Sequence, residues 1–417
     1  MESSFDALTT FDEEFATMGE KTGIEKEEEI EYPFDAEKIN ISVIPTPLSR
    51  LLERIENNTI SAPDIQRADD LWDIEKKSRL IESLMLKIPL PLFYVAADPD
   101  ENWKVVDGLQ RVNVIKQFMI EKEFKLRKLE FLTDYNGGSF EDLHGKYKNR
   151  IKDTVFQFAV ISATTPQEVQ RNIFKRLNTG GLPLTHQEVR HALYFCDKTS
   201  SFLKDLATAK EFLEATGGTV KDTRMAAREL VLRFISFLIR DCKTYPKNHN
   251  MDEFLSDTMV LMNEMPELKP NVLEKAFYKR KVNTTCKYRK FEDIKTYFCI
   301  GMLRARDLFD GHAFRKSTSL SSYKAPVNKS IFECVAICLS QMSQERFEYL
   351  MLHKHKLIEF FHSELKNNIQ LNHSISRNSQ EYKSVEYRFD WFRKVLLEQD
   401  YGGEDDCQFV VKKLQVF

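Results

Sequence analysis

Several signatures that would assign this chain to a familiar class are missing from its sequence. No apolar run approaches the ~18 residues that a membrane-spanning helix needs. The first residues are acidic rather than a basic stretch before an apolar one, so we expect no secretory signal. The H-E-x-x-H, Walker A and G-x-S-x-G motifs are also absent. These absences favour a cytoplasmic protein without a membrane partner.

Cysteine is scarce and scattered: seven residues, an odd number, without the spacing of a disulfide framework. Cys334 and Cys338 lie four residues apart on an expected helix and are candidate metal ligands. No other close cysteine pair or Cys/His cluster completes a site, which favours buried thiols instead. A reducing compartment fits this usage.

The chain of 417 residues is 42% hydrophobic and 30% charged, which predicts a soluble protein with two or more structural units. Its net charge of −3 is unevenly spread, because residues 1–31 hold eleven acids and two lysines. That segment carries −9, which leaves +6 for the rest of the chain. We expect residues 1–37 to be a largely disordered tail. It either competes for a basic, nucleic-acid-binding surface or simply solubilises the protein.

The hydrophobic patterning predicts an α+β domain over residues 38–200 and an all-helical domain over residues 201–417, without internal repeats. Helices are expected at 48–56, 75–86, 167–177 and 185–195, and strands at 92–97, 103–106, 125–132 and 154–161. Residues 60–65 are expected to form a short strand or a turn. Six helices are expected further on, at 224–239, 251–265, 291–308, 331–342, 344–361 and 384–398.

The most informative run is Val105 to Arg111, where a strand pattern meets an Asp-Gly turn and then a helix pattern. A helix start offers free N–H groups and the positive end of the helix dipole to an anion. Gly108 lets the backbone approach a ligand closely, and Arg111 can bind phosphate through two nitrogens. The alternative is a tight turn in which Asp107 caps the helix and pairs with Arg111.

Further motifs stand in order on both sides of this run. Upstream lie residues 60–67, 78–84 and the I-P-L-P-L sequence of 88–92; downstream lie residues 173–190 and 228–234. Together these motifs resemble the N-terminal domain family of the GmrSD restriction endonucleases, whose hallmark is a D-G-Q-Q-R motif. The resemblance covers roughly residues 40–335. It implies a ParB/sulfiredoxin-like fold for residues 38–200.

Carried over position by position, the hallmark motif falls on Asp107, Gly108, Gln110 and Arg111, with Leu109 where the family usually has glutamine. The resemblance implies that Asp107 holds Mg²⁺ or positions a water molecule, that Gln110 orients that water, and that Arg111 neutralises phosphate charge. Because one polar side chain of the motif is missing at Leu109, we expect nucleotide hydrolysis to be affected more than nucleotide binding.

Two other segments are candidates for the same nucleotide pocket. Gln66 and Arg67 offer a second phosphate contact, although Arg67 could instead pair with Asp69 or Asp70. The second segment ends a helix with a Gly-Gly turn that would present backbone N–H groups, or would simply terminate the helix. Its candidate nucleotide-binding residues are Arg176, Asn178, Thr179 and Gly180.

The most basic stretch interleaves cations with tyrosines, which suits phosphate contacts and base stacking. Its candidate DNA-binding residues are Lys279, Arg280, Lys281, Lys287, Arg289 and Lys290. A second such patch holds Arg315, Lys316, Tyr323 and Lys324. The alternative for both is a solvated face.

The resemblance implies a nucleotide-binding, NTP-hydrolysing sensor or regulatory subunit of a DNA restriction or anti-phage defence system. Many members of the family carry an HNH nuclease domain, but the late histidines here lack that spacing. We therefore expect a nucleoside triphosphate with Mg²⁺, DNA, and a protein effector such as a nuclease or an ATPase as partners; an oligomer is compatible with this function. The alternatives are a catalytically silent DNA-binding or protein-interaction module, and a direct DNA nickase.

Overall fold

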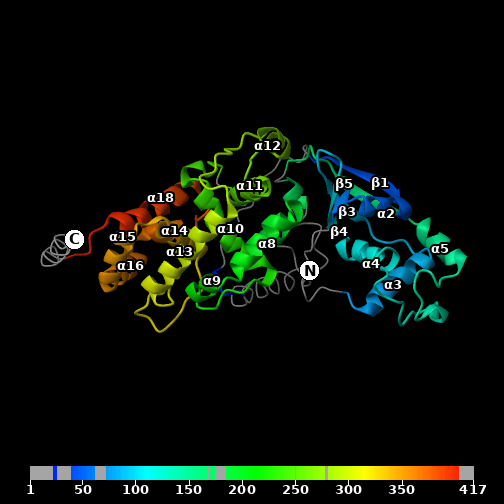
Figure 1. Cartoon of the computed structure of the whole chain (residues 1–417), viewed down its shortest axis with the longest axis horizontal. Helices are drawn as coiled ribbons and strands as arrows, with labels where there is room; N and C mark the ends of the chain where they lie inside the picture. Colours follow the sequence, from blue (N-terminus) through cyan, green and yellow to red (C-terminus); the bar gives the residue numbers. More distant parts are fainter. Residues whose placement is uncertain are drawn as a thin grey trace, which may run out of the picture. The chain divides into compact units, whose positions relative to one another are not determined.

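The computed structural model describes residues 22–25, 39–61, 72–166, 169–173, 185–248, 250–277 and 280–402. The chain divides into two compact units (Figure 1). Tyr32–Phe195 form the α+β unit; Met1–Glu31 and Cys196–Phe417 form the helical unit. The predicted fold class, mixed α+β followed by helices, is confirmed. Among the described helices, none is both long and apolar enough to cross a membrane.

The α+β unit is built on a five-stranded mixed sheet of order β1-β5-β3-β4-β2. Its strands are β1 (Ile41–Pro47), β2 (Ile60–Ser61), β3 (Phe93–Ala97), β4 (Trp103–Asp107) and β5 (Val155–Ile161). β1 runs antiparallel to β5, β5 parallel to β3, and β3 antiparallel to β4, which pairs in parallel with β2. The central strands β5 and β3 read as nearly continuous apolar runs because both faces of these strands are largely buried.

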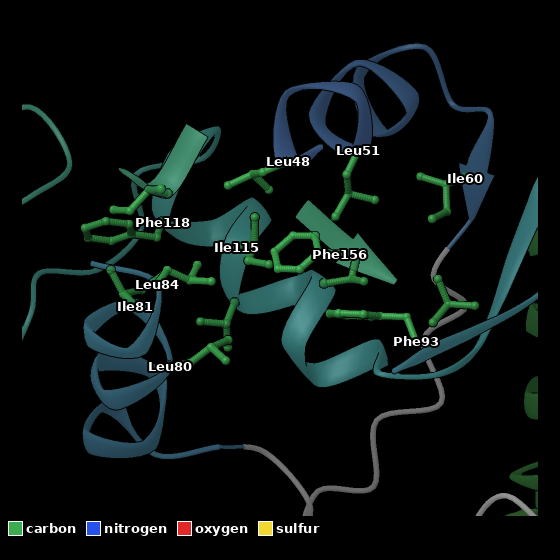
Figure 2. Close-up of a cluster of buried hydrophobic side chains, with 14 of the residues drawn as sticks. Leu48, Leu51, Ile60, Leu80, Ile81, Leu84, Phe93, Ile115, Phe118 and Phe156 are labelled. Carbon is green, nitrogen blue, oxygen red and sulfur yellow. The ribbon is translucent and has the colours of Figure 1, made fainter. Parts of the chain in front are cut away.

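Helices α2 (Leu48–Glu56), α3 (Ile74–Met85), α4 (Leu109–Met119) and α5 (Gly145–Lys152) contribute to one hydrophobic core with the sheet. Figure 2 shows Leu48 and Leu51 from α2 and Leu84 from α3 among the side chains around Phe156. In this core the rings of Phe93 and Phe158 stack with centroids 5.0 Å apart. This core fixes the end of β4 against the start of α4.

The predicted strand at 125–132 is wrong. This stretch is irregular and followed by a short 3₁₀ turn, η3 (Thr133–Tyr135). Several of its backbone N–H groups bond to side chains: the amide of Arg127 donates to Ser78 Oγ at 2.9 Å, and the amides of residues 130–132 donate to the carboxylate of Glu82. The amide of Leu126 donates to the carbonyl of Gly138. Side-chain acceptors from α3 therefore replace a sheet ladder.

Residues 169–173, inside the helix predicted at 167–177, are helical, and the rest of that predicted helix lies outside the described residues. Further along the chain is α7 (His186–Leu193). A capping box begins it, in which Thr185 Oγ1 accepts from the amide of Glu188 and the Glu188 carboxylate accepts from the amide of Thr185. Lys104 Nζ, from β4, donates to the carbonyl of Leu193 at 2.6 Å and so satisfies the C-terminal end of the helix.

The helical unit contains α8 (Asp197–Ala207), α9 (Lys210–Ala215), α10 (Ala226–Ile239), α11 (Met251–Glu264), α12 (Pro270–Ala276), α13 (Phe291–Phe309), α14 (Lys329–Gln341), α15 (Gln344–Leu352), α16 (Lys354–Asn367), α17 (Ile369–Ser376) and α18 (Tyr382–Arg393). Short turns η4 (Thr223–Met225), η5 (Cys242–Thr244) and η6 (Lys394–Glu398) complete it. The single helix predicted at 344–361 is two helices, α15 and α16, which meet at His353.

Helices α10 and α14 form the centre of this unit, and nearly all of their residues are buried. Cys334 and Cys338 are buried on α14, as expected for structural thiols, and burial raises the pKa of the Cys338 thiol to about 12. Glu333, on the same helix, accepts from Arg233 of α10 and from Arg388 of α18. A buried ion network thus links three helices.

Within the acidic N-terminal segment the structure describes residues 22–25; the rest of residues 1–37 lies outside the described residues, so the expected disorder stays a prediction. Thr22 and Ile24 are buried against the helical unit. The amide of Glu25 donates to the carbonyl of Val327 at 2.8 Å.

Candidate phosphate-binding turn between β4 and α4

The candidate site lies where β4 ends at Asp107 and α4 begins at Leu109. Gly108 connects them with φ 93° and ψ 10°, a left-handed conformation that glycine adopts without strain. A Cβ at this position would lie 2.5 Å from a ring carbon of Phe93, so the space also requires glycine. Because Gly108 has no side chain to cap α4, the N–H groups of the first turn have no acceptor supplied by the N-cap.

Arg111 holds this turn in place. Its guanidinium lies over the ring of Phe93, 4.2 Å from the centroid. Its Nη2 donates to the carbonyl of Leu92 at 3.2 Å and to Asp107 Oδ2 at 3.1 Å, and its Nη1 donates to the carbonyl of Pro91. Burial lowers the pKa of Arg111, and the charge of Asp107 opposes that shift. The I-P-L-P-L segment is thereby tied to α4.

Asp107 is the accessible acid of the turn, with 39% of its side chain exposed against 11% for Arg111. The predicted pairing of these two residues is present, but it is Gly108 rather than Asp107 that occupies the N-cap position. Gln110 follows in the first turn of α4 and is partly exposed. A carboxylate, an amide and the positive end of a helix dipole therefore meet at one partly exposed turn.

Leu109, the residue that departs from the family motif, packs against the hydrophobic core of the α+β unit. The substitution therefore falls on a side chain that contributes to packing. The polar members of the motif, Asp107 and Gln110, keep their exposure to solvent.

Asp107 is the carboxylate of this turn that could hold a magnesium ion together with phosphate. Within the described ranges, no group of three or more His, Cys, Asp or Glu side chains is arranged to hold a metal by itself. Mg²⁺ in phosphate-handling sites is usually bound by one or two carboxylates, with substrate phosphate and water supplying the other ligands. A single exposed carboxylate beside a helix start satisfies that requirement.

The other predicted nucleotide-binding residues cannot be placed. Gln66, Arg67, Arg176, Asn178, Thr179 and Gly180 all lie outside the described residues. Lys279, from the predicted DNA-binding set, also lies outside them.

The rest of the predicted DNA-binding set lies in the helical unit, before and at the start of α13. Lys281, Lys287, Arg289 and Lys290 are exposed. The rings of Tyr288 and Tyr297 pack with centroids 4.5 Å apart, and both are partly exposed. We call Lys287, Tyr288, Arg289, Lys290 and Tyr297 the α13 entry surface.

Arg280 differs from its neighbours because it forms ion pairs with Glu253 and Asp257 of α11. The second basic patch is also changed by the structure. Arg315 is only 1% exposed and donates to the carbonyl of Thr216 at 2.7 Å, and Lys316 pairs with Glu25. Burial therefore removes Arg315 from the predicted patch, whereas Lys316 stays partly exposed and Tyr323 and Lys324 are exposed.

Sequence reasoning missed two polar side chains that shape the α+β unit. Glu82 is 3% exposed, and its carboxylate accepts from three backbone amides in residues 130–132. Lys104 caps α7. The signal for Glu82 was its place among the apolar residues Leu80, Ile81 and Leu84, where a charged side chain needs buried partners.

Residues 48–195 match the family model of the GmrSD restriction endonuclease, N-terminal domain. This segment therefore forms a domain of that family, and the match ends where the α+β unit ends. It is shorter than the resemblance over residues 40–335, so the 228–234 motif lies outside it. No curated protein and no solved structure matches the chain.

Proposed function

We propose that this chain, whose residues 48–195 form a GmrSD-type N-terminal domain, is a nucleotide-responsive component of a DNA restriction or anti-phage defence system. The domain itself is of a restriction-system type. The observation that carries the nucleotide part is the turn at Asp107–Arg111: an accessible carboxylate, fixed by an arginine, beside a helix start that no side chain caps at Gly108.

In this proposal the N–H groups at the start of α4 bind a phosphate of a nucleoside triphosphate. Asp107 binds the Mg²⁺ that accompanies the phosphates, and this ion supplies charge neutralisation when bound. Gln110 orients an attacking water molecule. Arg111 contributes positive charge and keeps the Asp107 carboxylate in position, because its other contacts hold it against Pro91 and Leu92.

The remaining predicted residues complete the proposed pocket. Gln66 and Arg67 would supply a second phosphate contact. The 176–181 segment would supply backbone N–H groups through its glycines together with the side chains of Asn178 and Thr179.

DNA engagement is assigned in this proposal to the α13 entry surface. Lys287, Arg289 and Lys290 would contact phosphates, and the Tyr288–Tyr297 pair would stack with bases. Arg280 contributes less in this proposal, since its guanidinium is engaged by two carboxylates of α11. Binding or hydrolysis of the nucleotide would control this engagement, or control a nuclease or ATPase effector in the cytoplasm.

A binding module without hydrolysis is the second candidate, and one observation favours it. The guanidinium of Arg111 donates to two backbone carbonyls and one carboxylate within its own domain. An arginine committed in this way has fewer donors left for a transition state. This module would bind nucleotide or DNA without turnover. A direct nickase is the third reading of the same turn.

Phosphate release from each of the four nucleoside triphosphates, with Mg²⁺ and with or without DNA, tests the proposal. Asp107→Asn keeps the shape of the side chain and removes its charge. We expect turnover to fall about 100-fold or more in this variant. Asp153→Asn, the same change at an exposed position after α5, is the control and should leave turnover unchanged.

The outcomes separate the candidates. Turnover that survives Asp107→Asn contradicts the assigned site. Nucleotide binding without turnover in the wild-type chain supports the silent module. Metal-dependent plasmid nicking that is lost in Asp107→Asn supports the nickase.

A further inference from the structure

The N-terminal residues Thr22 to Glu25 lie in a slot of the helical unit. One wall is the loop of residues 216–221 that follows α9; the other is the segment of residues 314–328 that leads into α14. The amide of Lys221 donates to the carbonyl of Thr22 at 3.1 Å, from the first wall. The amide of Val327 donates to the carbonyl of Gly23 at 2.9 Å, from the second. The segment is thus hydrogen-bonded on both sides.

The two walls of the slot are linked to each other by the side chain of Arg315. Arg315 is 1% exposed, and it donates to the carbonyl of Thr216 and to Thr219 Oγ1, both at 2.7 Å. The same guanidinium donates to the carbonyl of Ala325 on the opposite wall. A buried cation therefore links the two walls directly, through contacts that do not involve the N-terminal segment.

Gly23, Ile24 and Glu25 each make specific contacts with the walls of the slot. Gly23 has φ 70°, and a Cβ there would lie 2.1 Å from the carbonyl oxygen of Thr219, so only glycine fits. Ile24 is 4% exposed and pairs in parallel with Val327. Glu25 forms an ion pair with Lys316 and accepts from Asn328 Nδ2 at 2.9 Å. A glycine, an apolar residue and an acid are recognised in order.

The occupant is the chain's own acidic segment. Five further acids lie within six residues of this anchor in the sequence: Glu20, Glu27, Glu28, Glu29 and Glu31. A tethered ligand is present at an effective concentration in the millimolar range. Carboxylates that adjoin the anchor in sequence can compete with nucleic-acid phosphate for the cations of a mildly basic unit.

We propose that residues 22–25 are an anchor that docks the acidic N-terminal segment in this slot, and that the docked segment competes with nucleic acid for the cations of the helical unit. The second half rests on the DNA engagement proposed above; the anchor does not. Release of the anchor would raise affinity for DNA without any change at the nucleotide site.

The anchor is tested with the full-length variant Ile24→Asp, which places a charge in a buried apolar position. A fluorescent peptide of residues 19–31 is titrated into this variant and into the wild-type chain. We expect the peptide to bind the variant at least about tenfold more tightly, because the wild-type slot is already filled. A peptide that itself carries Ile24→Asp should bind neither chain. Equal binding of the two peptides, or of the normal peptide to both chains, would overturn the anchor.

If Ile24→Asp impairs folding, Glu25→Gln provides a second variant, since it keeps the shape and removes the charge that pairs with Lys316. Hydrogen exchange at the amides of Lys221 and Val327 should quicken in either variant. Unchanged exchange at both amides would contradict docking.

The competition is tested by binding of a single-stranded oligonucleotide at two salt concentrations. We expect Ile24→Asp to bind about tenfold more tightly than the wild-type chain at low salt. Ile30→Asp adds the same charge to the same segment outside the anchor and should bind like the wild type. Tighter binding by both variants, or by neither, overturns competition. If no chain binds DNA, the competition and the proposed DNA engagement both fail, while the peptide titration still decides the anchor.

Discussion

At the scale of single residues, the turn at Asp107–Arg111 is specified by few side chains. Gly108 is fixed by its positive φ and by the ring of Phe93, and Arg111 is fixed by the same ring and by two backbone carbonyls. The family motif therefore contains residues that build the turn as well as residues able to meet a ligand. Substitution of a residue that builds the turn should lower the stability of the domain, whereas substitution of a residue that contacts a ligand should lower ligand binding.

Gly108→Ala should destabilise the α+β unit by about 2–4 kcal/mol, because the substitution adds left-handed strain and a clash with Phe93. Urea denaturation measures the change. Gly145→Ala is the matched control: a Cβ at Gly145 meets nothing within 4 Å, so this variant should be neutral or slightly stabilised. Equal effects at the two sites would contradict the account of Gly108.

Arg111→Lys keeps the positive charge and removes the forked donor geometry. We expect a loss of about 1–3 kcal/mol in the free energy of unfolding, because contacts with Pro91, Leu92 and Asp107 cannot all be kept. Arg79→Lys, at an exposed position of α3, should change it by less than about 0.5 kcal/mol. A variant at 111 as stable as the one at 79 would show that the fork is not needed.

At the scale of elements, periodicity and turn signals located most helices and the strands β2, β3, β4 and β5. The strand β1 (Ile41–Pro47) was missed, because most of its side chains are exposed and its two prolines do not suggest a strand. The 103–107 strand and the helix after it were predictable because Asp-Gly stands between two clear patterns. The start of α7 was predictable from Thr185, whose capping box with Glu188 the structure contains. The candidate site at Asp107–Arg111 was located from the sequence because it lies at this same junction of strand, turn and helix.

What failed depended on contacts distant in sequence. The 125–132 stretch was predicted as a strand, but Ser78 and Glu82 of α3, more than 40 residues earlier, accept hydrogen bonds from several of its amides. The docked residues 22–25 read as part of an acidic tail, and their partners lie about 200 and 300 residues later, at Lys221 and Val327. Short-range sequence patterns do not predict hydrogen bonds between residues that are so far apart in the chain.

Glu82→Gln tests this at the element scale. Glutamine offers one oxygen and turns an NH₂ group toward a backbone donor, so one or more of the three bonds to residues 130–132 is lost. We expect a loss of about 2 kcal/mol and faster hydrogen exchange at the amides of residues 130–132.

The control for this variant is Glu75→Gln, on the same helix. The Glu75 carboxylate is partly exposed and pairs with Lys128, so removing its charge should cost less than about 1 kcal/mol. Exchange in residues 130–132 that is no faster in Glu82→Gln than in Glu75→Gln would contradict the role given to Glu82.

At the scale of the whole molecule, the chain joins a domain of recognised family to a helical unit that this family match does not cover. Both units bury apolar side chains. The helical unit in addition places Glu333 between two buried arginines, Arg233 and Arg388. Loss of the central carboxylate would leave both cations buried without it.

Glu333→Gln should therefore destabilise the helical unit by about 3–5 kcal/mol. Hydrogen exchange in α10, α14 and α18 measures the effect where the network lies. Glu386→Gln, at an exposed position of α18, should leave exchange in these helices unchanged. A Glu333 variant with native exchange would show that the arginines find other acceptors.

The central claim is that Asp107 and the start of α4 form a magnesium-dependent triphosphate site. Calorimetric titration of the full chain with each nucleoside triphosphate, with and without Mg²⁺, tests it most directly. The account predicts saturable binding of at least one triphosphate that requires Mg²⁺ and weakens about tenfold or more in Asp107→Asn but not in Asp153→Asn. Absence of binding for all four, or binding that is indifferent to Asp107, would contradict it.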